Sequence, residues 1–239
     1  MESACWLMST HLLLRSFVAA SFSRASSYQL PVNCTSSVTM EVQFTGSWYD
    51  EALEKEAATK LLNNKCVLIS QHADSMGAPT ACENAGVPNV SYNGSTQSAC
   101  PNTFIISSRI DWTPYFKFII DAVKNDKEIP ADWCEGLEAG SVKLTEINEK
   151  VAAKGTKEAI EDAKAKLIAG EINVFDTENF TVEGKKLDSY LADVDTDAEY
   201  KKDTEAIKDG YFHESEYRSA PYFDITIDGI TLLNTNFGE

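Results

Sequence analysis

Positive charge is scarce in this chain. Lys and Arg contribute 21 residues against 37 Asp and Glu, which gives a formal net charge of −16. Such acidity repels nucleic acid and anionic membrane surfaces, so we expect neither as a direct partner. The six cysteines stand singly, without a CxxC pair, which argues against a structural zinc site. We therefore expect no metal ion and no cofactor.

The cysteines and the glycosylation triplets leave some alternatives open. Cys66 opens an apolar run and is predicted to be a small buried hydrophobic residue. Cys82 and Cys100 can pair in an oxidising compartment, but their spacing does not decide whether they do. The four N-x-S/T triplets begin at Asn33, Asn89, Asn93 and Asn179. These triplets matter only if the chain is secreted from a glycosylating cell.

A long hydrophobic run is also missing. Residues 6–20 are moderately apolar, but His11 and Arg15 interrupt them and no cluster of positive charge precedes them. The segment is therefore a poor secretory signal and too broken to span a membrane. Arg15, Arg24 and the nearby serines weakly indicate a transit peptide, and a remodelled start of the chain is an equal alternative.

The usual motifs of nucleotide-binding and hydrolytic enzymes are absent as well. The surroundings of Gly77 and Gly94 match neither GxGxxG nor a P-loop. No serine or cysteine nucleophile with a matching base accompanies His72. A small hydrolase or transferase that uses His72 and a carboxylate is therefore the weakest functional hypothesis. We expect that the chain is not an enzyme.

Regular patterning begins near Val38. Apolar residues alternate or run continuously in strand-like segments at 38–44, 66–70, 87–92 and 103–107. Helical patterns lie between them, beginning at Asp50, covering 77–85, and covering 113–124 with Pro114 at the first turn. Strands that alternate with helices predict an α/β fold with a parallel sheet and right-handed crossovers.

The second half is less regular. We predict a strand at 142–144, a helix from 149 to 170, a strand at 172–175 and a hairpin at 180–187 around Gly184. The acidic stretch 188–209 is predicted to be a surface helix, and residues 222–233 have strand-like composition.

Ligands of open α/β sheets bind beyond the carboxyl ends of the parallel strands. In chain order, the residues that follow the four strands are Ser47, Trp48, Tyr49 and Asp50; Gln71, His72, Asp74 and Ser75; Asn93 and Gly94; and Ser108, Arg109, Asp111 and Trp112. This set suits a flat, uncharged or weakly basic ring. Trp48 or Trp112 can stack on the ring face, while Asp74, Asn93 and Asp111 can accept from ring N–H groups or ribose hydroxyls.

Each of these residues also has a structural interpretation. Trp48 can simply cover the edge of the sheet, and Asp50 is better explained as a helix N-cap. His72 alone is more often a loop histidine than a catalyst, and Asp74 can start the following helix. Arg109 can hold a phosphate, but it has no glycine-rich loop beside it.

An ordered series of segments resembles a known family. The segments are Ser47-Trp48-Tyr49-Asp50 before a Glu-Lys-Glu-Ala-Ala helix, Gln71-His72-Ala73-Asp74-Ser75, Asn93, Asp111-Trp112-Thr113-Pro114-Tyr115, Trp133 with Gly136, and the segments 140–144 and 170–175. From about residue 38 to 175 the chain resembles the basic membrane protein family of receptors, which includes purine nucleoside receptors of ABC importers. No single motif carries this resemblance; the order of the segments does.

The resemblance implies a type I periplasmic-binding-protein-like fold that closes on its ligand between two lobes. We expect mainly the second lobe with a remnant of the first, because family members of ordinary length have roughly a hundred further residues before this point. The expected division is a poorly defined segment at 1–30, a ligand-binding lobe at 31–187 and an acidic extension at 188–239. Residues 113–134 would pack on the first lobe and leave apolar surface exposed without it.

The resemblance also implies a function. We expect an extracytoplasmic solute-binding protein that binds a purine base or nucleoside and delivers it to an ABC permease. By position, Trp48 is the stacking aromatic, with His72, Asp74, Asn93, Asp111 and Trp112 in or near the cleft. The alternative is a surface or interaction protein that keeps only the scaffold and does not transport a solute.

Overall fold

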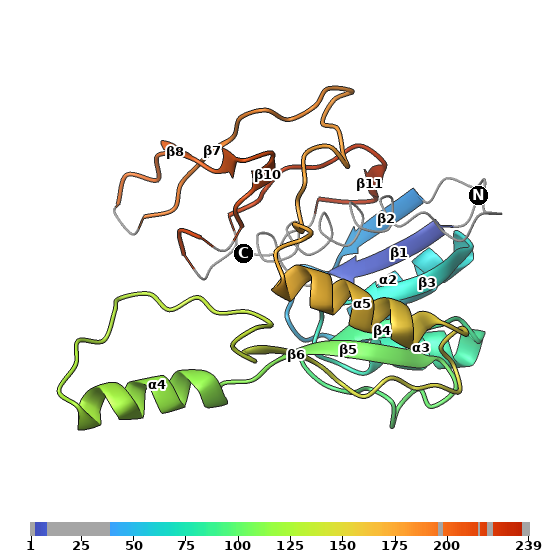
Figure 1. Ribbon diagram of the computed structural model, residues 1–239. Coiled ribbons are helices and arrows are strands. Elements are labelled where there is room, and N and C mark those ends of the chain that lie inside the picture. Colours follow the sequence, from blue (N-terminus) through green and yellow to red (C-terminus); the bar gives the residue numbers. More distant parts are fainter. Residues whose placement is uncertain (1–2, 9–38, 196–197, 215, 219–221, 236–239) are drawn as a thin grey trace.

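The computed structural model describes residues 3–8, 39–195, 198–214, 216–218 and 222–235. Its centre is a seven-stranded sheet in the order β11-β2-β1-β3-β4-β5-β6 (Figure 1). The strands are β1 (Ser3–Met8), β2 (Thr39–Phe44), β3 (Cys66–Gln71), β4 (Asn89–Tyr92), β5 (Phe104–Ile110), β6 (Val142–Leu144) and β11 (Ile230–Leu232). All neighbours are parallel except β5 and β6. The predicted parallel α/β sheet is confirmed.

Both ends of the sequence contribute strands to this sheet. Strand β1 lies between β2 and β3, with Trp6 level with Val42 on one side and Ser70 on the other. Strand β11 pairs with the opposite edge of β2. There the Asn234 side chain accepts from the Phe44 N–H and donates to its carbonyl, both at 2.9 Å. The sequence patterns did not predict β1. Most of the segment 1–30, which was expected to be poorly defined, lies outside the described residues.

Helices α2 (Glu51–Asn63) and α3 (Gly77–Ala85) cover one face of the sheet. Asp50 is the N-cap of α2, as predicted, and its carboxylate accepts from the Leu53 N–H at 2.9 Å. Gly86 ends α3 in the left-handed conformation that a side chain would disfavour. The apolar residues between these helices and β3 form one core cluster, made of Ala57, Ala58, Leu61, Cys66, Ile69, Ala73, Ala78, Ala81 and Cys82.

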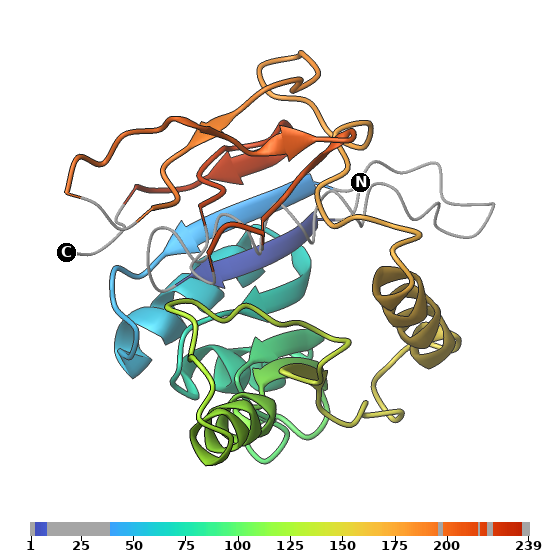
Figure 2. The ribbon, with the colours of Figure 1, turned by 60° about the vertical axis from the view of Figure 1, so that its left-hand side comes forward.

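The segment after Phe175 covers part of the other face (Figure 2). It carries two short hairpins, β7 (Leu191–Ala192) with β8 (Thr204–Glu205), and β9 (Ile207–Lys208) with β10 (Tyr211–Phe212). Phe175 stacks on Phe223 with ring centroids 4.3 Å apart, and both pack with Met40, Val42 and Phe44 of β2. This segment therefore supplies much of the hydrophobic core on that face.

Two predictions for this region are wrong. Residues 188–209 form short strands instead of a surface helix, because Ala192, Ala206 and Ile207 are buried in the core while the acidic side chains around them remain at the surface. Residues 172–175 form a turn instead of a strand. The predicted hairpin around Gly184 is confirmed by the Val182–Lys185 bridge.

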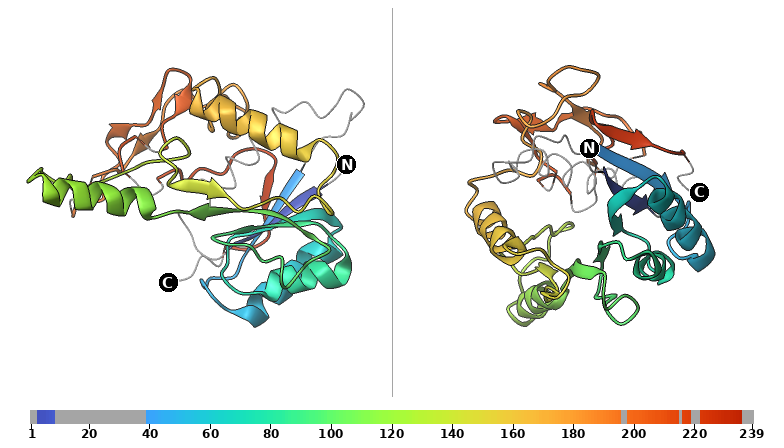
Figure 3. Two further views of the ribbon diagram at one scale, coloured as in Figure 1. Left: turned by 60° about the horizontal axis from the view of Figure 1, so that its bottom comes forward. Right: turned by 90° about the vertical axis from the view of Figure 1, so that its right-hand side faces the viewer.

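Two helices follow the antiparallel edge of the sheet. Helix α4 (Thr113–Lys124) has the predicted bounds and projects away from the sheet (Figure 3). Its side chains Phe116, Ile120 and Val123 are exposed. Helix α5 (Thr156–Ile168) begins later than predicted, after Gly155 in a left-handed conformation with φ of 91°. It lies on the side of the sheet opposite α2 and α3 (Figure 3).

The cysteines are not paired as the sequence allowed. Cys66 is buried, as predicted, and it is also disulfide-bonded. Cys82 and Cys100 are free thiols, both fully buried. Burial, with the nearby Cys100 as a second cause, raises the pKa of Cys82 to about 12.

The contact between α2 and α3 gives a first test. A Cβ added at Gly77 would lie 2.4 Å from the backbone oxygen of Glu51, which cannot move without shifting α2. Gly77→Ala should therefore lower the free energy of unfolding by about 1–3 kcal/mol, the usual cost of overpacking. Gly94→Ala is the control, since a Cβ there meets nothing within 4 Å. Urea titration followed by circular dichroism measures both, and equal midpoints would contradict the close approach.

Candidate functional site

The loops after β2 and β3 meet at the carboxyl edge of the sheet. The Asp74 N–H donates to the Trp48 carbonyl at 3.0 Å and ties the two loops together. Trp48 leaves 46% of its surface exposed, and Asp74 is also exposed. The structure thus brings together an exposed indole and an exposed carboxylate, as the sheet-edge rule predicted.

His72 lies beneath this surface. It is buried, its ring stacks on Tyr92 with centroids 4.0 Å apart, and the Trp48 ring is 6.3 Å away. Burial lowers the pKa of His72 to about 4, so the imidazole is neutral at pH 7. Burial and the charge of Asp74 raise the pKa of Tyr92. Tyr92 was missed by the sequence reasoning, although its place at the end of β4 was the signal that could have found it.

A buried carboxylate positions both loops. Glu54 of α2 is fully buried; it accepts from the Ser75 hydroxyl at 2.6 Å and from the Asp50 N–H at 3.1 Å. The Ser75 N–H also points to this carboxylate at 3.2 Å. Burial raises the pKa of Glu54, while these hydrogen bonds lower it by a smaller amount. Its place in the helical pattern gave no signal of this role.

The remaining predicted residues follow β4 and β5. Asn93 is exposed, has a left-handed φ of 66°, and donates its N–H to the Ser108 carbonyl at 2.7 Å. Asp111 accepts from the Lys143 ammonium at 2.6 Å, with Arg109 3.8 Å away. The Lys143 and Thr113 hydrogen bonds hold the pKa of Asp111 well below its usual range. Arg109 is therefore occupied by a carboxylate and does not face a glycine-rich phosphate loop.

Trp112 is separate from the Trp48 group. It precedes α4, is 58% exposed, and lines a hollow of about 600 Å³ together with Asp111. Trp48, His72 and Asp74 do not line this hollow. The six predicted residues therefore lie in three places. Trp48, His72 and Asp74 lie together with Tyr92, and we call these four residues the Trp48 group. Asn93 faces solvent, and Asp111 and Trp112 form a separate pair.

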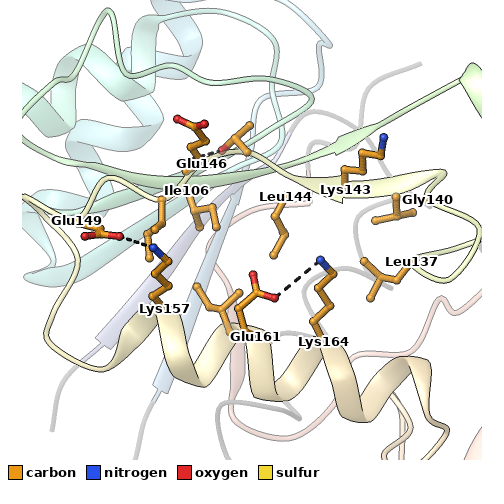
Figure 4. A pocket seen from close by; sticks show the side chains of 14 residues that line it. Ile106, Leu137, Gly140, Lys143, Leu144, Glu146, Glu149, Lys157, Glu161 and Lys164 are labelled. Atoms are coloured by element: carbon orange, nitrogen blue, oxygen red, sulfur yellow. Dashed lines mark hydrogen bonds and ion pairs between the residues drawn. The ribbon is translucent and has the colours of Figure 1, made fainter.

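A further hollow of about 550 Å³ lies between α5 and the edge strand β6 (Figure 4). Lys157, Glu161 and Lys164 of α5 face Leu144 and the β5 residue Ile106 across it. The charged side chains of α5 that line it are already paired: Lys157 with Glu149 at 2.6 Å, and Lys164 with Glu161 at 3.9 Å. None of the predicted site residues lines this hollow, so we do not assign the solute site to it.

The sequence matches a known protein family. Residues 32–178, well over half of the chain, match the family model described as ABC transporter substrate-binding protein PnrA-like. The chain belongs to this family. This is a family of substrate-binding proteins and not of enzymes, which confirms the expectation that the chain is not an enzyme. In the part of the chain that the structure describes, no cluster of three or more His, Cys, Asp or Glu could hold a metal ion.

Two curated relatives match in sequence. TsgA13 of Haloferax volcanii, whose name describes an ABC transporter glucose-binding protein, is 27% identical over 138 residues, covering 57% of this chain and 35% of the relative. A purine-binding protein of Brucella abortus is 25% identical over 140 residues, covering 57% and 38%. The chain thus spans little more than a third of the length of these relatives.

Solved structures of solute-binding proteins share the fold. The protein from Aeropyrum pernix K1 superposes with a TM-score of 0.58 at 17% identity, covering 73% of this chain and 58% of that one. The protein from Conexibacter woesei gives 0.52 at 20% identity, covering 72% and 56%. These likenesses confirm the periplasmic-binding type of fold. Within the described residues, none of the helices has the length and apolar character needed to cross a membrane.

The buried imidazole predicts a pH dependence of stability. Unfolding returns the pKa of His72 from about 4 toward 6.5, so between these values the unfolded state binds a proton that the folded state does not. Stability should therefore fall as the pH drops from 7 to 5, with His72 contributing about 2 kcal/mol. Urea titrations at both pH values, for wild type and His72→Gln, isolate this share. A variant that loses as much stability as wild type over this range would contradict a buried neutral imidazole.

The Glu54 contacts give a third stability test. Glu54→Ala leaves the buried Ser75 N–H and hydroxyl without their acceptor, so it should lower the free energy of unfolding by about 2 kcal/mol. Glu56→Ala, on the exposed face of the same helix, is the control and should change little. Thermal unfolding compares them, and similar melting temperatures would show that the carboxylate does not hold the loops.

Proposed function

We propose that this protein is the ligand-binding part of an extracytoplasmic solute receptor and that the Trp48 group binds a purine base or nucleoside. The observation that carries the proposal is the exposed indole of Trp48 in a loop tied to the exposed Asp74, with the buried His72 and the Tyr92 ring stacked on it beneath. Membership of the PnrA-like family supports a receptor.

The chemistry of the group favours a flat heterocycle. An exposed indole gives a planar stacking surface, and aromatic pairs contribute about 0.5–1.5 kcal/mol beyond burial. The carboxylate of Asp74 can accept from a ring N–H or from two ribose hydroxyls. Because the pKa of His72 lies near 4, the imidazole beneath the ring is uncharged at neutral pH and does not repel a weakly basic purine.

One relative supports this ligand and another points elsewhere. The Brucella abortus relative is named for purine binding, whereas TsgA13 is named for glucose binding. Sugars also stack on indole rings, so stacking on Trp48 does not distinguish a purine from a sugar. The residues that hydrogen-bond the ligand must determine which of the two binds. Asp74 and Asn93 supply the nearby exposed polar side chains, and both ligand classes belong in the first experiment.

An ABC permease is the proposed recipient of the ligand, and the disulfide at Cys66 fits the oxidising compartment in which such receptors work.

A second candidate function is a surface or interaction protein that keeps the scaffold without transport. The exposed apolar side chains of α4, among them Phe116, Ile120 and Val123, favour it, because such a stripe is typical of protein contacts.

A thermal-shift titration tests the ligand. We expect one of adenine, hypoxanthine, adenosine, inosine or guanosine to raise the melting temperature in a saturable way, whereas glucose has no effect. Trp48→Leu should weaken binding about tenfold through the loss of stacking and burial. Tyr49→Leu is the matched control, since Tyr49 is the neighbouring aromatic and 65% exposed.

Other outcomes redirect the assignment. A shift with glucose alone would favour a sugar as the solute of this chain. No shift with any solute at millimolar concentration would favour the interaction protein. Equal loss in the Trp48 and Tyr49 variants would contradict the role of Trp48 as the stacking ring.

A further inference from the structure

The hollow beside Trp112, which we call the α4 hollow, has a composition unlike that of the Trp48 group. It lies between the start of α4, the segment 130–136 and the start of β6, and its volume is about 600 Å³. This volume falls within the range of small-molecule sites. Only Asp111 and Trp112 of the sequence-predicted residues line it.

Aromatic rings form one wall of the α4 hollow. Tyr115 lies edge-on to Trp112 with ring centroids 6.0 Å apart, and its centroid is 5.2 Å from that of Trp133. Trp133 also packs on Phe118, with a centroid distance of 6.3 Å. Two indoles and one phenol therefore stand in one contiguous group, and the negative faces of such rings attract cations.

Among the described residues, the charged side chains that line the α4 hollow are all acidic: Asp111, Asp132 and Glu135. Lys143 and Arg109 neutralise Asp111 from outside, at 2.6 and 3.8 Å. Glu135 is exposed, and among the described residues no cation is paired with it. The chain's net charge of −16 adds to the attraction for a positive ligand.

A buried hydroxyl without a partner also lines the hollow. Ser141 is 5% exposed, and within the described part of the chain its Oγ has no hydrogen-bond partner. Its backbone is fixed, since its carbonyl accepts from the Asp111 N–H at 2.8 Å and its N–H donates to the Gly136 carbonyl at 3.0 Å. Leaving such a group unsatisfied costs free energy, which a ligand hydroxyl or N–H would recover.

We propose that the α4 hollow binds a small organic ammonium ion. The rings of Trp112, Tyr115 and Trp133 face the cation, Glu135 supplies the opposite charge, and Ser141 hydrogen-bonds a neighbouring polar group of the ligand. An inorganic cation does not fit, because the carboxylates do not converge as metal ligands in the described structure. The site is distinct from the Trp48 group and goes beyond the purine assignment.

Isothermal titration of the whole chain with choline tests this proposal, with the neutral isostere 3,3-dimethyl-1-butanol titrated in parallel. Choline should bind saturably and at least about tenfold more tightly than the isostere, because only choline gains the cation–π and carboxylate interactions. Trp133→Leu should weaken choline binding about tenfold, whereas Trp48→Leu should leave it unchanged. Glu135→Gln, at an exposed position where folding should be unaffected, should weaken it about threefold.

Three results would overturn the proposal. The first is equal binding of the isostere, which would make the hollow merely apolar. The second is unchanged choline affinity in both the Trp133 and Glu135 variants. The third is no binding up to about 10 mM choline, a concentration at which even a weak specific site would fill. Purine binding serves as the independent control. If Trp48→Leu weakens purine binding while the Trp133 and Glu135 variants keep it, the two sites are separate.

Discussion

The hydrogen bonds to the buried Glu54 carboxylate hold the site-bearing edge of this sheet in place. Glu54 sits on the inner face of α2 and binds the chain just after β2 at Asp50 and just after β3 at Ser75. Trp48, His72 and Asp74 lie within a few residues of these two points. The Asp74–Trp48 backbone hydrogen bond is a second link between the two loops. Gly77 completes the arrangement, because only a residue without a side chain lets α3 approach α2 so closely.

The parts of the fold that follow local rules could be predicted from the sequence. Strands β2 to β5 and helices α2 to α4 each carry their own periodicity, and caps such as Asp50 and Gly86 fix their ends. The rule that ligands bind at carboxyl strand ends then located Trp48, His72 and Asp74 on one edge.

The parts that depend on distant partners could not be predicted. Strand β1 is set by pairing with β2 and β3, whose residues lie far away in the chain, and not by a pattern of its own. The acidic segment beyond 188 has a helix-like composition, yet burial of Ala206 and Ile207 against β2 overrides it. Glu54 was missed for the same reason, because its importance comes from hydrogen bonds with Ser75 that only the folded chain creates.

The surface of the protein has two regions with exposed aromatic rings, and these regions differ in their electrostatics. The Trp48 group has one exposed indole above a neutral imidazole, which suits an uncharged heterocycle. The α4 hollow has three clustered rings, and the charged residues that line it in the described part of the chain are acidic, which suits a cation. The family model ends at residue 178. Phe212 and Phe223 lie beyond it, yet they pack on strand β2, which the family model covers.

The role of Trp48 in solute binding can be observed directly by ¹⁹F NMR of protein labelled with 5-fluorotryptophan, because the chain has only four tryptophans, Trp6, Trp48, Trp112 and Trp133. Each resonance is assigned by single substitution, and the purine that stabilises the protein is then titrated. We expect a saturable shift of the Trp48 resonance while that of Trp133 stays in place. A ligand that binds without moving the Trp48 resonance, or that moves only Trp133, would contradict the assignment of the solute site to the Trp48 group.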